Sequence, residues 1–106
     1  MNISFRDLTV YKKAFSLAME IFEISKKFPV EEKFGLTSQI RNSSRSVCSS
    51  VAEAYRKRKY PAHFISKISD ADMENSETQV WLDFSLECKY IDSKLYKDLL
   101  IKSEEV

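Results

Sequence analysis

Residues 9–28 read TVYKKAFSLAMEIFEISKKF, and apolar side chains return in this stretch every three or four positions. Because an α-helix completes a turn in 3.6 residues, that spacing places them on one helical face. Pro29 disfavours helical geometry in the residue before it, so we predict a helix from Thr9 to Phe28. Its main apolar stripe consists of Val10, Ala14, Leu17, Ala18, Ile21, Ile24 and Phe28.

Two further segments with the same period follow the proline. We predict a second helix that begins within residues 34–37 and ends in the basic run 56–59. Pro61 suits the first turn of a helix, where no backbone N–H is needed, so a third helix is predicted from Pro61 to about Tyr90. Asn75 is a polar member of its core stripe and could fix the helix register through a buried hydrogen bond. The two core stripes are Leu36, Ile40, Val47, Val51 and Ala54, and then Phe64, Ile68, Ala71, Leu82 and Leu86.

A short fourth helix completes the pattern. Asp92 or Ser93 can cap it, and its inward positions are Leu95, Tyr96, Leu99, Leu100 and Val106. The whole chain of 106 residues contains one glycine and two prolines, which argues against the many tight turns of an all-β fold. With 43% hydrophobic and 31% charged residues it can bury a core of its own. We therefore predict one all-α domain over residues 1–106, an antiparallel up-down four-helix bundle.

The two cysteines and the N-terminus bear on where the protein resides. Cys48 and Cys88 lie far apart without the spacing of a zinc site or a redox pair, so we interpret both as buried free thiols. The first residues do not form a basic and apolar signal peptide, and no apolar run approaches the roughly 20 residues that span a bilayer. We expect a soluble cytoplasmic protein with no membrane partner.

Second apolar stripes widen the hydrophobic arc of the two long predicted helices. A fourth helix of about four turns leaves more apolar surface than one chain covers, and contiguous surface of this kind usually marks an interface. We predict a homo-oligomer interface made by Phe15, Phe22, Met73, Val80, Trp81 and Phe84. The alternative is that a bent first or fourth helix covers these side chains within one chain.

Residues suited to catalysis or metal binding are scarce. His63 is the only histidine and has no acid or nucleophile at a diagnostic spacing, so we expect a surface or capping role. Asp70, Glu74 and Glu77 share one helical face but lack the Glu-x-x-His pairs of bundle metal sites, which favours a solvated acidic face. Gly35 is the only glycine, so there is no glycine-rich phosphate loop. We predict no catalytic residue, no metal and no cofactor.

Charge is unevenly distributed in a chain whose net charge is only +1. Residues 33–59 carry seven basic side chains and one acid, whereas residues 70–106 carry four basic side chains and ten acids. Arg41, Arg45 and Arg56 fall within about 60° of one another on an ideal helix, and Lys57, Arg58 and Lys59 extend the stripe. Such a stripe could bind nucleic-acid phosphates. A solvated face, or pairing with acids of the third helix, remains the alternative.

Several short motifs resemble one known family. They are FPVEEKFGLTSQIR at residues 28–41, DLTVYKKA at 7–14, Ser46-Val47, Ala52-Glu53, Trp81-Leu82-Asp83 and Tyr90-Ile91. Together they resemble the four-helix bundle proteins encoded within intervening sequences of bacterial 23S ribosomal RNA genes. Relatives of that family include the accessory variability protein of diversity-generating retroelements. Where the family commonly has proline, asparagine and glycine, this chain has Cys48, Ser50 and Ala54, which favours a straighter second helix.

The resemblance implies a bundle that assembles into a ring of five, nucleic-acid binding by its basic members, and no catalysis. We therefore expect a non-enzymatic oligomeric scaffold, an accessory protein that binds RNA or DNA or a nucleic-acid-processing protein. The alternative is a protein–protein adaptor that does not contact nucleic acid.

Overall fold

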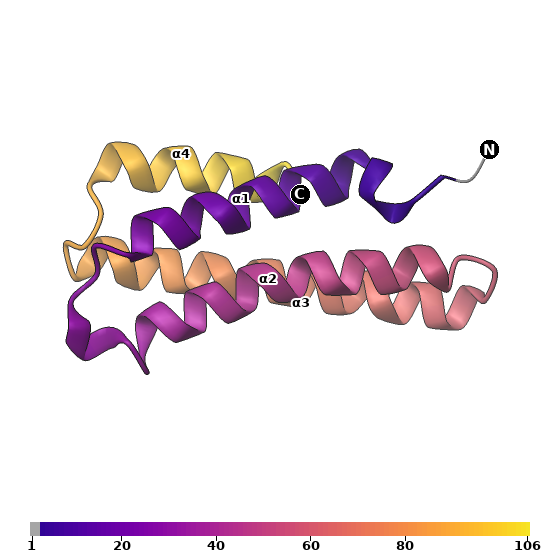
Figure 1. Cartoon of the computed structure of the whole chain (residues 1–106), viewed down its shortest axis with the longest axis horizontal. Helices are drawn as coiled ribbons and strands as arrows, with labels where there is room; N and C mark the ends of the chain where they lie inside the picture. Colours follow the sequence, from indigo (N-terminus) through magenta and orange to yellow (C-terminus); the bar gives the residue numbers. More distant parts are fainter. Residues whose placement is uncertain (1–2) are drawn as a thin grey trace.

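The computed structural model describes residues 3–106 and consists of four α-helices that alternate in direction (Figure 1). The helices are α1 (Thr9–Ser25), α2 (Leu36–Arg56), α3 (Pro61–Glu87) and α4 (Ser93–Glu104). Short 3-10 turns η1 (Phe5–Asp7) and η2 (Val30–Glu32) precede α1 and α2. Residues 3–106 include no strand, and the bundle measures 44 × 22 × 20 Å. The predicted all-α class and four-helix bundle are confirmed.

Two predicted helix ends are wrong by about one turn. α1 ends at Ser25, not at Phe28, because residues 26–28 tighten into turns in which each N–H bonds the carbonyl three residues back. Phe28 nevertheless enters the core. α3 ends at Glu87, not near Tyr90, because Lys89 adopts a left-handed conformation with φ 64°.

Helices α3 and α4 begin at residues whose side chains favour a helix N-terminus. Pro61 occupies the first turn of α3, and the side chain of Asp92 accepts a 2.8 Å hydrogen bond from the backbone N–H of Leu95 at the start of α4. α2 runs without interruption through Cys48, Ser50 and Ala54. All three of these side chains are buried.

Two apolar clusters form the core, and α1 contributes side chains to both. The larger joins all four helices, and Ile21, Ile40, Leu82 and Leu99 are each 1% exposed. The smaller is built around Ala14, Ala18, Val47, Cys48, Val51 and Ala71. Small side chains in this second cluster let α1, α2 and α3 approach closely.

A polar layer crosses the middle of the bundle. The hydroxyls of Thr78 on α3 and Ser43 on α2 lie 2.9 Å apart. The amide of Asn75 donates to the backbone carbonyl of Ser103, whose hydroxyl donates back to Asn75 Oδ1, both at 2.9 Å. This reciprocal pair agrees with the register role predicted for Asn75, since it fixes α4 against α3.

Burial corrects two further predictions. Phe64 and Ile68 were expected in the core but are 37% and 44% exposed, because α4 is short and covers only the other half of α3 (Figure 1). Cys48 is buried as predicted, but Cys88, just after α3 ends, is exposed. Among the described residues, no helix is both long and apolar enough to cross a bilayer.

Candidate nucleic-acid interface

We use the name basic face for the six predicted side chains, Arg41, Arg45, Arg56, Lys57, Arg58 and Lys59. They lie on α2 and in the turn after it, and all except the half-buried Arg41 are exposed. The ion pairs formed within residues 3–106 include none of these six. The alternative prediction, that these cations pair with acids of α3 in the same chain, is therefore wrong.

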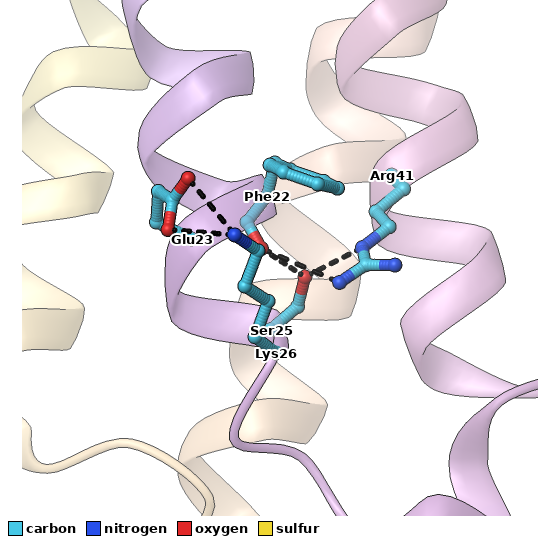
Figure 2. Close-up of polar contacts among 5 residues, drawn as sticks. All are labelled: Phe22, Glu23, Ser25, Lys26 and Arg41. Atoms are coloured by element: carbon cyan, nitrogen blue, oxygen red, sulfur yellow. Dashed lines mark hydrogen bonds and ion pairs between the residues drawn. The ribbon is translucent and has the colours of Figure 1, made fainter.

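Arg41 is anchored across the α1–α2 contact. Its Nε donates to Ser25 Oγ at 2.8 Å, and its Nη2 donates to the backbone carbonyl of Phe22 at 3.3 Å (Figure 2). Its guanidinium carbon lies 4.7 Å from the centre of the Phe22 ring. These contacts satisfy a carbonyl at the end of α1 and orient the guanidinium, leaving Nη1 for another acceptor.

Three cations gather around the same phenyl ring. Arg45 lies 5.6 Å from the centre of the Phe22 ring, and Lys26 Nζ lies 4.7 Å from it. Of the three, Lys26 alone pairs with a carboxylate, that of Glu23 at 3.1 Å (Figure 2). Phe22, which the sequence assigned to an oligomer interface, is thus partly covered by cations of its own chain.

The other end of the basic face combines cations with aromatic rings. Arg56 lies 6.0 Å from the Phe5 ring, and Arg58 lies 4.0 Å from the ring of Tyr55. Arg58 also donates a 2.8 Å hydrogen bond to the carbonyl of Tyr55. Because guanidinium groups stacked on rings stay oriented with less entropy loss, this end presents ordered donors to solvent.

An apolar groove of about 390 Å³ separates the two cationic clusters. We call it the α1–α2 groove. Most of the side chains that line it are aromatic or aliphatic, and Arg45 lines it as well. The side chains of Phe15 and Met19 are 50% and 45% exposed. The lining residues are Phe5, Tyr11, Phe15, Ala18, Met19, Arg45, Cys48, Ser49 and Ala52.

Some cations near this groove were missed by sequence reasoning. Arg6 and Lys12 line a hollow that adjoins the groove beside Tyr11 and Phe15. Lys26 belongs to the Phe22 cluster described above. All three lie outside the basic run of α2, and only the packing of η1 and α1 on α2 brings them near it.

The predicted acidic face lies on α3. Together with Met73 and Val80 it lines an open hollow of about 630 Å³ that we call the acidic hollow: Asp70, Asp72, Met73, Glu74, Ser76, Glu77 and Val80. Glu74 accepts a hydrogen bond from the Ser50 hydroxyl, yet burial raises the pKa of this carboxyl above its usual value. Lys67 bridges Glu53 at 2.7 Å and Asp70 at 3.6 Å. Residues 3–106 contain no cluster of three or more His, Cys, Asp or Glu arranged to hold a metal ion.

The six predicted interface residues fall on separate surfaces. Met73, Val80 and Phe84 are 67%, 46% and 52% exposed along α3. Trp81 is half-buried against the core and donates a 3.3 Å hydrogen bond to Glu77. Phe15 lies in the α1–α2 groove, so the structure does not bring the set together in one chain.

His63 lies exposed in the first turn of α3. Its ring meets the ring of Tyr60 edge-on, with 6.4 Å between the ring centres. The surface location predicted for this histidine is therefore confirmed.

The fold and the cation-lined surface define a helical-bundle protein with a candidate anion-binding face. Residues 6–106 match the family model of the 23S rRNA-intervening sequence protein, and the chain belongs to that family. A crystal structure of a protein of unknown function from the S23 ribosomal protein family of Bacteroides thetaiotaomicron is similar, with a TM-score of 0.81 and 30% identity. The match covers 91% of this chain and 86% of that chain. A comparison with curated proteins finds no match.

Proposed function

We propose that this protein is a non-enzymatic accessory bundle that binds the phosphates of RNA or DNA through its basic face and associates with further copies of itself. The observation that carries the proposal is the set of six cations that no carboxylate within residues 3–106 neutralises. A phosphate chain gains affinity by releasing condensed counterions to such cations. The net charge of +1 does not oppose this, because phosphates respond to the local potential.

Three finer points belong to the same proposal. Kinship with the accessory variability protein and assembly into a ring of five rest on the sequence motifs quoted above. Self-association is also supported by Met73, Val80 and Phe84, which remain exposed on α3. Residence in the cytoplasm would give the basic face access to nucleic acid.

Fluorescence anisotropy tests the binding with labelled single-stranded RNA, single-stranded DNA and duplex DNA of equal length, titrated at several salt concentrations. The double variant Arg56→Gln/Lys57→Gln removes two exposed cations of the basic face. The control Lys94→Gln/Lys97→Gln removes the same charge from exposed positions on α4.

We expect binding that weakens steeply with salt. The first variant should lower the slope of log K against log salt by about 1.4 for single strands and about 1.8 for duplex DNA, and the control should not. Equal effects of the two variants would show that only net charge matters. No binding of any probe at low salt would favour the alternative function, a protein–protein adaptor.

A further inference from the structure

Aromatic rings and cations lie together where α2 turns into α3. We call residues 55–66 the hairpin tip. It lies at the end of the bundle that α4 does not reach, and residues 56–66 are all exposed (Figure 1). Residues 56–66 carry four lysine or arginine side chains and no carboxylate. The nearest acids in the sequence on either side, Glu53 and Asp70, both pair with Lys67.

Two rings of the hairpin tip are open to solvent. The side chain of Tyr60 is 60% exposed, although tyrosine usually buries much of its ring. His63 is exposed as well, and its ring stands at 82° to the Tyr60 ring. Lys57 Nζ lies 5.8 Å from the centre of the Tyr60 ring. One ligand can therefore meet a ring and a cation together.

Hydrogen bonds hold these groups in place. The backbone N–H of Tyr60 donates to the carbonyl of Lys57 at 2.8 Å, which closes the turn. The hydroxyl of Tyr55 donates to the carbonyl of Ile3 at 2.8 Å, which ties the N-terminal segment to the end of α2. A ligand that binds groups already held in place loses less conformational entropy.

We propose that the hairpin tip binds single-stranded nucleic acid by stacking an unpaired base on the ring of Tyr60, while Lys57 and its basic neighbours hold the adjoining phosphates. This inference rests on the phosphate binding proposed above and names single strands as the preferred class of nucleic acid. Every base has a π face, so such stacking tolerates any sequence. A duplex keeps its base faces inside the stack and offers its phosphates alone.

Charge distinguishes Tyr60 from another exposed ring of this chain. Phe34 is 88% exposed, and Lys33 Nζ lies 5.4 Å from the centre of its ring. Glu31 and Glu32 precede Phe34 closely, however, and carboxylates repel phosphates. Tyr60 has no acid within six residues in either direction. Of the two rings, Tyr60 is the one suited to a nucleic-acid base, and Phe34 provides a matched control.

An abasic strand separates base stacking from phosphate binding. Fluorescence anisotropy at low salt compares labelled oligothymidylate with a labelled abasic strand of equal length, which carries the same phosphates. Tyr60→Leu removes the ring, Tyr60→Phe keeps it, and Phe34→Leu removes the control ring, which precedes α2. The side chain of Tyr60 makes no capping hydrogen bond to α3, so the variants at this position should fold, as circular dichroism will check.

We expect the unaltered chain, Tyr60→Phe and Phe34→Leu to bind oligothymidylate more tightly than the abasic strand. Tyr60→Leu should lower the ratio of the two affinities by about fivefold or more, the usual effect of losing one stacked base. Equal affinity of the unaltered chain for both strands, or an unchanged ratio in Tyr60→Leu, would overturn the inference and leave phosphate binding standing. Failure of both strands to bind would overturn the inference and the proposed function together.

Photocrosslinking locates the base without any substitution in the protein. Oligothymidylate that carries iodouracil in place of some thymines is irradiated in complex with the unaltered chain, and mass spectrometry identifies the attached residue. We expect attachment at Tyr60 or His63. Attachment at Phe34, or only at residues outside the hairpin tip, would contradict the stacking site.

Discussion

The hydroxyl of Tyr90 donates a 2.9 Å hydrogen bond to Oε2 of Glu32, across 58 residues of sequence. The other oxygen of the same carboxylate accepts a 3.2 Å hydrogen bond from the backbone N–H of Leu36, the first residue of α2. One side chain of η2 thus caps α2 and binds the segment that follows α3. These contacts close the end of the bundle from which the basic face begins.

The link between Tyr90 and Glu32 predicts a loss of stability in alkali. The hydrogen bond to the Glu32 carboxylate raises the pKa of Tyr90 to about 12. The contribution of this hydrogen bond to the free energy of unfolding is fully present below the ordinary tyrosine pKa of about 10. That contribution is lost as the pH rises from there through about 12. The melting-temperature difference between the unaltered chain and Tyr90→Phe should be constant up to about pH 10 and then shrink. The exposed control Tyr60→Phe should show no such trend, and a difference that persists to pH 11.5 would refute the assignment.

Gly35 makes room for the same carboxylate. A Cβ at this position would lie 2.8 Å from Glu32 Oε1, so Gly35→Ala must displace the group that caps α2. We expect a loss of about 1 kcal/mol in the free energy of unfolding, the usual contribution of a helix cap. Chemical denaturation measures it. In a Glu32→Ala background the same substitution should cost much less, and an equal cost in both backgrounds would exclude the carboxylate as the cause.

Asn75 fixes the register of α4 through its reciprocal bonds with Ser103, which is completely buried. Asn75→Leu leaves the Ser103 carbonyl without this donor, so the free energy of unfolding should fall by about 1–3 kcal/mol. Asn42→Leu, at an exposed position on α2, should change it by no more than about 0.5 kcal/mol. Similar urea midpoints for the two variants would show that the polar pair is not needed for stability.

Helical period and proline positions were sufficient to predict the four helices and most of the core. The predicted start of α3 at Pro61 and the capping by Asp92 are confirmed. Helix ends were less accurate because residues 26–28 and Lys89 take turn conformations that apolar spacing does not encode. The prediction that Phe64 is buried was wrong, because the burial of this side chain depends on how far α4 extends over α3.

The candidate site was predictable only as a list of side chains. The sequence placed Arg41 and Arg45 on one stripe, but the contact of Arg41 with Ser25 depends on how α1 packs on α2. Lys26 was missed for the same reason, since its position beside Phe22 is a tertiary feature. One-dimensional spacing shows which residues share a helix face and does not show which side chains reach a neighbouring helix.

Lysine footprinting tests the location of the phosphate-binding surface most directly. The protein is acetylated briefly at low salt with and without saturating single-stranded RNA, and mass spectrometry follows each lysine. We predict slower acetylation of Lys57 and Lys59 in the presence of RNA, and an unchanged rate at Lys94 and Lys97 on α4. Protection of Lys94 and Lys97 equal to that of Lys57 and Lys59, or no protection at Lys57 and Lys59 when RNA is bound, would contradict the proposed interface.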